Sequence, residues 1–271
     1  MPPELTDLQY DVTYTAMTGA FAALAGALLY FVLVRSTVSR RYHAALAVAA
    51  VVVGVAALHY LRLISSFTDA YVHDAALGAW VPTGVPIAEG LRYVDWLITV
   101  PLLLAQIVLV LRLERDEARR LIQRLVLAAI AMIALGYPGE LASDTTVKLV
   151  FWFLGAVPFA YIIYLLWVEL NRSLFRYSDA VALTVSRARL LLVVTWMAYP
   201  IAYLFPVVGL DDAGGEVARQ VLYSVADVTS KVGFGLLVVR IARLLTEEDD
   251  AKGEGRVDLS DAGRGLSSLD V

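Results

Sequence analysis

Residues 222–239 read LYSVADVTSKVGFGLLVV, an apolar run long enough to cross a membrane that contains one acid, Asp227, and one lysine, Lys231. The two are four residues apart, so a helix would place them on one face, roughly 6 Å apart along its axis. An ionisable side chain inside a bilayer is costly unless it is paired. The run therefore predicts a transmembrane helix with either a functional site or a structural ion pair.

The composition of the whole chain is typical of a helical membrane protein. Of its 271 residues, 59% are hydrophobic and 18% are charged, and the mean hydropathy is +0.70. Soluble domains are closer to half apolar and about a quarter charged. The chain has no cysteine, which excludes disulfides, thiol catalysis and thiolate metal sites. We expect no metal site and no nucleic-acid partner.

Seven apolar segments, each near the length that crosses a bilayer, follow one another along the chain. They cover residues 10–34, 42–66, 89–111, 121–137, 147–168, 180–205 and 217–245. We therefore expect an all-α membrane protein, a seven-transmembrane-helix bundle formed by residues 10–245 between an N-terminal segment, 1–9, and a disordered tail, 246–271. Arginines gather in the loops after the first, third and fifth segments, and the opposite loops are acidic. The positive-inside rule then predicts an extracellular N-terminus and a cytoplasmic C-terminus.

The third segment adds a second acid, Asp95, to the one in the last segment. Thr99 follows Asp95 by one helical turn and Gln106 by about three turns, while Arg92 precedes it by three residues. Thr99 and Gln106 are also the kind of side chain that simply joins membrane helices by hydrogen bonds. Two acids, an arginine and a lysine within one bundle nevertheless indicate a site that handles charge.

Three motifs resemble those of the microbial rhodopsins, seven-helix proteins that bind retinal as a Schiff base. They are RYVDWLITVPLLL at 92–104, WMAYP at 196–200 and ADVTSKVGFG at 226–235. The resemblance extends from the first helix to Leu245. It implies that all-trans retinal is bound covalently to Lys231, with Asp95 and Asp227 as counterions, in a multi-pass protein of the cell inner (plasma) membrane. The residues that it places along the retinal are Trp96, Trp196, Tyr199, Tyr203 and Leu103, the last at a position where leucine goes with green absorption.

Other motifs resemble a bacterial branch of this family. His59, in AALHYLRLISSF, is similar to the histidine that proteorhodopsins and xanthorhodopsins pair with the primary counterion. A membrane histidine can otherwise be a packed helix contact. IALGYPGE at 133–140 fits the same branch, and EVARQVLYSVADVTSKV at 216–232 resembles the part of it that holds sodium and chloride pumps. Those pumps also have glutamine at the position of Gln106, so the transported ion is an open question.

The resemblance favours a light-driven outward proton pump rather than an enzyme. Chloride pumps of this branch have a neutral asparagine at the position of Asp95, and sodium pumps move the acid to the position of Thr99. Asp95 with Thr99 is the arrangement of outward proton pumps, in which the carboxylate accepts the Schiff-base proton. Retinal-supplied membranes would therefore move protons under light.

Two departures from the family pattern leave alternatives open. Gln106 stands where many proton pumps have a carboxyl donor, and an amide cannot supply a proton. Val208 and Arg219 stand near the places of the bacteriorhodopsin-like proton-release glutamates. A slow photosensor and a pump of another ion, chloride or sodium, remain alternatives, and a generic transporter would come next if retinal were absent.

The resemblance also implies partners besides the lipid bilayer and protons. Members of the branch usually form homo-oligomers, trimers or pentamers. Carotenoid-binding relatives have a glycine at the position of Trp152, so we expect no carotenoid antenna here.

Overall fold

The structure is a computed structural model that describes residues 2–111 and 113–252. Its long helices are α1 (Asp7–Val34), α2 (His43–Ala70), α3 (Gly90–Leu111), α4 (Arg115–Leu141), α5 (Thr145–Tyr164), α7 (Asp179–Trp196), α9 (Ala213–Val228) and α10 (Phe234–Ala251). Its short elements are η1 (Arg35–Thr37), η2 (Arg40–Tyr42), β1 (Tyr71–Asp74), β2 (Ala79–Pro82), η3 (Leu165–Glu169), α6 (Asn171–Leu174), α8 (Ala198–Tyr203), η4 (Phe205–Val208) and η5 (Thr229–Gly233).

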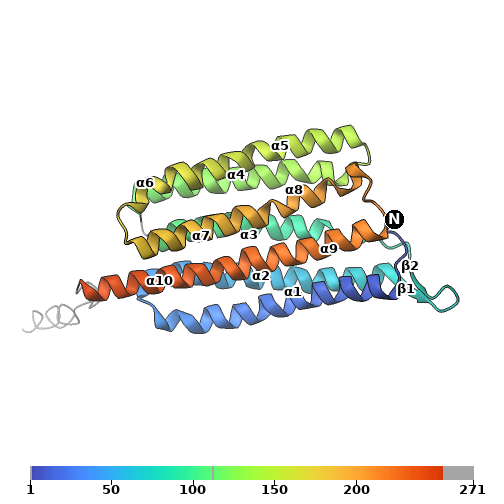
Figure 1. Cartoon of the computed structure of the whole chain (residues 1–271), viewed down its shortest axis with the longest axis horizontal. Helices are drawn as coiled ribbons and strands as arrows, with labels where there is room; N and C mark the ends of the chain where they lie inside the picture. The colour runs from blue at the N-terminus through green and yellow to red at the C-terminus, as the bar shows by residue number, and fades with distance from the viewer. Residues whose placement is uncertain (1, 112, 253–271) are drawn as a thin grey trace, which may run out of the picture.

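Seven helical rods lie side by side in the described part of the chain (Figure 1), because α5–α6, α7–α8 and α9–α10 each continue as one rod. Six stretches within the described residues are long and apolar enough to cross a membrane. The seventh rod, 213–251, carries Asp227 and Lys231 in its middle. The predicted all-α membrane bundle is confirmed; its orientation in the membrane stays a prediction.

Prolines lie within several of the rods. Pro101 and Pro158 lie inside α3 and α5. The sixth rod is interrupted at Met197, between α7 and α8, three residues before Pro200. Because proline has no backbone N–H, it leaves a carbonyl of the preceding turn without its helical partner.

Helices α4 and α10 extend furthest beyond the predicted segments. α4 begins at Arg115 and ends at Leu141, beyond both ends of the predicted segment 121–137. α10 continues to Ala251, so residues 246–251 are helical and do not belong to a disordered tail. The loop after α1 holds this extension, since Ser39 N donates to Thr246 Oγ1 (3.0 Å) and Tyr42 OH donates to Asp249 Oδ2 (2.8 Å). The rest of the predicted tail, 253–271, lies outside the described residues.

A hairpin that the sequence analysis did not predict covers the end of the bundle near the N-terminus (Figure 1). Strands β1 and β2 pair in antiparallel register, with Tyr71 opposite Pro82. Leu5 makes a β-bridge with Trp80, and the Tyr10 ring stacks on the Trp80 ring at a centroid distance of 3.6 Å. The hairpin forms the connection between α2 and α3, and the N-terminal segment packs against it.

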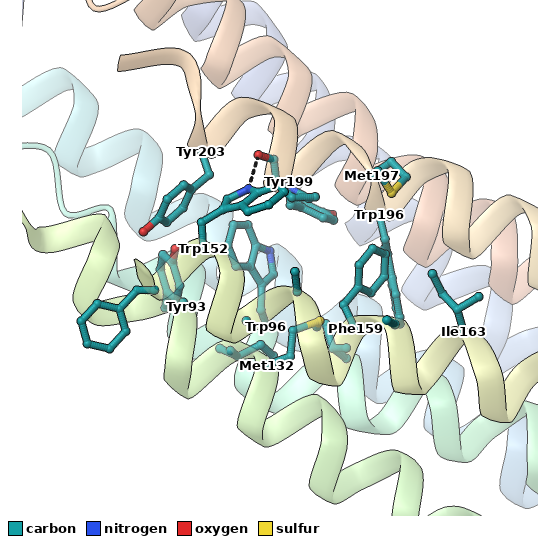
Figure 2. A pocket seen from close by; sticks show the side chains of 18 of the residues that line it. Tyr93, Trp96, Met132, Trp152, Phe159, Ile163, Trp196, Met197, Tyr199 and Tyr203 are labelled. Atoms are coloured by element: carbon teal, nitrogen blue, oxygen red, sulfur yellow. Dashed lines mark hydrogen bonds between the residues drawn. The ribbon is translucent and has the colours of Figure 1, made fainter. Parts of the chain in front are cut away.

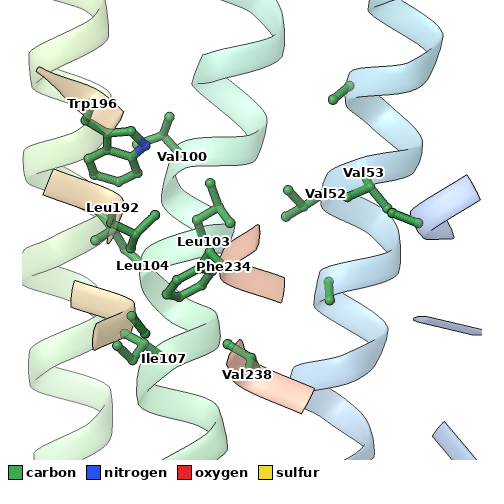
Figure 3. Packing of buried hydrophobic residues seen from close by; sticks show 14 of the residues in the cluster. Val52, Val53, Val100, Leu103, Leu104, Ile107, Leu192, Trp196, Phe234 and Val238 are labelled. Carbon is green, nitrogen blue, oxygen red and sulfur yellow. The ribbon is translucent and has the colours of Figure 1, made fainter. Parts of the chain in front are cut away.

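Helix α3 is the central rod. Of its apolar window, 72% is buried, against 28–50% in the other five candidate spans. Its residues Val100, Leu103 and Ile107 pack between Val52 of α2, Leu192 of α7 and Phe234 of α10 (Figure 3). Burial of these side chains fixes α3 in the bundle, and with it every polar residue that α3 carries.

We predict that Gly235→Ala destabilises the bundle by about 1–3 kcal/mol, the usual cost of overpacking. A Cβ at this position would lie 2.4 Å from Cζ of Phe31, a fully buried ring on α1. The matched control is Gly26→Ala, where a Cβ would meet nothing within 4 Å. Thermal unfolding in lipid nanodiscs, followed by tryptophan fluorescence, should show a lower Tm for G235A only. Equal Tm values for the two variants would contradict the packing at Phe31.

Candidate functional site

Lys231 lies in the π-helical turn η5, at the middle of the last rod, with 2% of its surface exposed. Its Nζ donates to Asp95 Oδ2 of α3 at 2.8 Å and to Asp227 Oδ1 of α9. Isolated π turns inside α-helices are frequent at functional sites. The structure thus brings together the lysine and the two acids that the sequence singled out on two separate helices.

The two carboxylates beside Lys231 have different surroundings. Asp227 Oδ2 accepts from Tyr60 OH (2.9 Å), and Oδ1 accepts from Tyr199 OH (2.8 Å) and Trp96 Nε1 (3.4 Å). Asp95 Oδ1, in contrast, has no hydrogen-bond partner among the described residues. Neutral donors stabilise the ionised form of a carboxylate. Asp227 is therefore held as an anion, and Asp95 is the carboxylate with a free oxygen for a proton.

Arg92 balances the charge of this group. Lys231 carries one positive charge and its two carboxylates carry two negative charges, so the group has a net charge of −1. Arg92 is buried one turn from Asp95 on α3 and supplies the positive charge that compensates it. Its Nη1 donates to Tyr60 OH at 3.4 Å, which in turn donates to Asp227. Its Nε lies 3.2 Å from Glu89 Oε2. Arg92 thus connects the Lys231 site with acids nearer the N-terminal end of the bundle.

Three other predicted residues do not bond to this group in the described chain. Thr99 Oγ1 donates to the backbone carbonyl of Asp95 (2.9 Å), not to its carboxylate. His59 lines a small cavity with Asp95, and its Nδ1 bonds to Val55 O of its own helix (2.9 Å). The pair of His59 with Asp95 stays a prediction. Gln106 is fully buried, and its amide atoms have no partner among the described residues.

A cavity of about 310 Å³ adjoins the lysine site (Figure 2). Trp96 and Tyr199 belong both to its wall and to the hydrogen-bond shell of Asp227, so it begins beside Lys231. Its wall also includes Tyr93, Met132, Trp152, Phe159, Trp196 and Tyr203. The cavity is apolar and aromatic and starts at a buried lysine, as a hydrocarbon cofactor attached to that lysine requires.

The predicted cavity residues lie as follows. Trp96, Trp196, Tyr199 and Tyr203 all line the cavity. Leu103 is not among the residues that line the cavity; it is buried next to Phe234 (Figure 3). Trp152 lines the cavity, and its Nε1 donates to Pro200 O at 2.9 Å (Figure 2). The absence of a carotenoid stays a prediction.

The sequence analysis missed three residues of the site. Tyr60 follows His59, and its hydroxyl donates to Asp227. Tyr223 and Gln220 precede Asp227 by four and seven residues, one and two turns on the same face of α9. The Tyr223 ring faces the Arg92 guanidinium at 5.1 Å, and Gln220 Oε1 accepts from Arg92. Tyr223 and Gln220 could have been identified from the sequence, because their spacing from Asp227 places them on the same helix face.

Comparisons with known proteins agree with this geometry. Residues 11–245 match the family described as bacteriorhodopsin-like protein. The chain is 28% identical over 233 residues to a green-light absorbing proteorhodopsin from Gamma-proteobacterium EBAC31A08, a match that covers 86% of this chain and 87% of that protein.

Two solved structures are similar over nearly the whole bundle. The structure of thermophilic rhodopsin superposes with a TM-score of 0.89 at 39% identity, covering 92% of this chain and 99% of that one. Xanthorhodopsin, described as a light-driven ion pump with dual chromophore, gives a TM-score of 0.87 at 38% identity, with the same coverage.

Lys231 is the one buried lysine of the described residues, and its partner Asp227 accepts hydrogen bonds from Trp96 and Tyr199 of the cavity wall. Retinal, held as a Schiff base on a lysine, is the cofactor that fits it. The chain therefore belongs to the bacteriorhodopsin-like family, as a membrane-embedded microbial rhodopsin of the proteorhodopsin-like branch that carries retinal on Lys231.

Proposed function

We propose that this light-driven retinal ion pump moves protons outward and that Asp95 is the group that accepts the proton. The observation that carries the proposal is the difference between the two carboxylates at Lys231. Asp95 Oδ2 lies 2.8 Å from Nζ while its Oδ1 has no partner among the described residues, and both oxygens of Asp227 are engaged. A proton is therefore accommodated more easily on Asp95.

Bound to Lys231, retinal supplies light absorption, isomerisation and a protonated nitrogen. The protein's own part is to hold charge in fixed places around that nitrogen. Tyr60, Tyr199 and Trp96 keep Asp227 ionised, so a negative charge remains beside Lys231 after Asp95 has been neutralised. Arg92 keeps the whole group close to electrically neutral beforehand.

The same geometry argues against the other ions. A chloride ion beside Lys231 would meet two carboxylates already in contact with Nζ, and like charges repel strongly in a buried site. Thr99 stands where sodium pumps have their acid, and its hydroxyl is bonded to the Asp95 carbonyl. Outward movement rests on the orientation that the arginine-rich loops predict, with the N-terminal end of the bundle outside.

A sensory function remains the second candidate because of Gln106. This side chain is fully buried three turns from Asp95, on the side of the bundle away from Arg92. An amide cannot donate a proton to reset the site, which predicts a slow cycle of the kind that suits signalling.

We predict that cells expressing the chain and supplied with retinal acidify an unbuffered medium under light, and that a protonophore abolishes the acidification. Asp95→Asn should abolish it too and shift the absorption to the red, because the cation loses its counterion and acceptor together. Asp69→Asn, at an exposed position of α2, is the matched control. Alkalinisation that the protonophore enhances would instead mean transport of another ion, and a coloured protein without any signal would favour the sensor.

We predict that Lys231→Ala abolishes the visible absorption of retinal-supplied membranes, since the amine that binds the cofactor is removed. Lys252→Ala, a lysine at the exposed end of the last helix, should keep the colour. Both variants are compared by absorption spectra at equal protein content. A visible band that survives in K231A would refute the attachment site.

We predict that recovery of the initial absorption after a flash slows in proportion as the proton concentration falls, because Gln106 offers no internal donor. Gln106→Glu should speed recovery and make it less dependent on pH. Gln123→Glu, the same change at an exposed position of α4, should leave both unchanged. Recovery of the unaltered chain that is independent of pH would mean that another group donates the proton.

A further inference from the structure

A stripe of exposed apolar and aromatic side chains follows one face of α5. Its members recur every three or four residues, the spacing of a single helix face, and each is 40–69% exposed. They are Val150, Phe153, Val157, Tyr161 and Tyr164. In a bundle that crosses a membrane, a face of this kind is in contact with lipid chains.

The end of this stripe lies at the level of the lipid headgroups. No charged residue stands between Lys148 and Glu169 in the sequence, a stretch of about 30 Å at the rise of a helix. The hydrocarbon core of a bilayer has about the same thickness. The rings of Tyr161 and Tyr164 are stacked near this end, at a centroid distance of 6.2 Å, and exposed tyrosines concentrate at membrane interfaces.

Four arginines and two glutamates gather at this level, and we call this group the arginine seam. It consists of Arg120, Arg124, Arg172, Arg176, Glu117 and Glu169. The seam lies between α4 and the α5–α6 rod, at the end of the bundle away from the N-terminus (Figure 1). Arg124 connects it with the stripe, since its Nε donates to Tyr161 OH at 2.8 Å.

The contacts within the seam are long or exposed. Arg124 Nη1 and Arg172 Nη1 each lie 3.5 Å from one oxygen of the same carboxylate, Glu169. Arg176 Nη1 lies 3.1 Å from Glu117 Oε2, and the other oxygen of Glu117 accepts from Ser173 Oγ. Ion pairs in such exposed places are weak. They leave the guanidiniums accessible to another anion.

The seam carries a surplus of positive charge. Its four guanidiniums face two carboxylates, which leaves two positive charges without a partner of opposite sign. Arg120 lies on the face of α4 that carries Glu117 and Arg124, is exposed, and has no bonding partner among the described residues. Arg172 is 69% exposed and uses one of its five N–H donors on Glu169. The seam therefore has both the charge and the free donors to bind an anion.

The position of the seam indicates which anion fits. A guanidinium binds the oxygens of a phosphate through two parallel hydrogen bonds. The apolar stripe that leads to the seam from the hydrocarbon core offers contact to an acyl chain, which a free phosphate ion does not have. A zwitterionic headgroup would bring an ammonium next to the surplus arginines, whereas an anionic headgroup would not.

We propose that the arginine seam binds the phosphate of an anionic glycerophospholipid, whose acyl chain lies along the stripe of α5. Arg120, Arg124 and Arg172 hold the phosphate oxygens, and Glu169 competes with the lipid for two of these arginines. The lipid belongs to the leaflet at the α6 end of the bundle. This inference does not depend on which ion the protein transports.

The test is lipid binding to the purified, retinal-loaded protein in detergent, measured by native mass spectrometry. The probes are phosphatidylglycerol and phosphatidylcholine with the same acyl chains. The first adduct of the unaltered chain should form more readily with phosphatidylglycerol. The double variant R120Q/R172Q should bind phosphatidylglycerol about 25-fold more weakly, since an arginine near a membrane surface contributes about fivefold. Its visible absorption should stay unchanged, because both side chains are exposed.

The matched control removes the same charge elsewhere at this end of the bundle. R35Q/R187Q replaces two exposed arginines outside the seam and should keep the binding of phosphatidylglycerol. An equal loss in the control and in R120Q/R172Q would mean that overall charge alone attracts the lipid, and would overturn the site. Equal binding of the two lipids by the unaltered chain would also overturn it.

A second variant should change binding in the opposite direction, so that a damaged fold cannot imitate the result. Glu169→Gln removes the competing carboxylate and should strengthen the binding of phosphatidylglycerol about fivefold. Glu247→Gln, at an exposed position of α10, should leave it unchanged. Weaker binding by E169Q would contradict the proposed competition. Displacement of the lipid by an equal concentration of inorganic phosphate would mean that the seam binds a free anion and not a lipid.

Discussion

A positive charge in the interior of a membrane protein needs negative charge in direct contact, and the arrangement of this bundle follows from that need at Lys231. Asp95 reaches the lysine from α3 and Asp227 from its own rod. The two contacts require α3 to lie at the centre of the bundle against the last rod. The apolar residues of α3 above and below Asp95 provide the packing that keeps it there.

Polar groups are distributed unequally on the two sides of Lys231. Toward the N-terminal end, hydrogen bonds and ion pairs connect Arg92, Gln220, Glu89 and Arg219. Toward the other end, the amide atoms of Gln106 have no partner among the described residues. Charged and hydrogen-bonded groups are therefore concentrated on the Arg92 side of Asp95.

Much of the fold and the centre of the site could be predicted from the sequence. Membrane-length apolar runs predicted the rods, and helical spacing predicted that Asp227 and Lys231 share a face. The extension of α10 could not be predicted, because Asp249 and Thr246 are held by the distant loop after α1. The ion pair between Glu140 and Arg219 could not be predicted either, since Glu140 on α4 meets Arg219 only after the helices have packed. The motif around His59 placed this residue near Asp95, and both line the same small cavity.

The π-helical turn at Thr229–Gly233 changes the direction in which the side chains of the last rod face. A π turn contains one residue more than an α turn, so the halves on either side differ in phase by about 100° from one uninterrupted helix. Asp227 and the residues before it follow one stripe, and Phe234 and Val238 follow another. The rod is thus two amphipathic helices with separate faces, joined at the residue that carries the cofactor. The turn thus sets how the residues after Lys231 face the rest of the bundle.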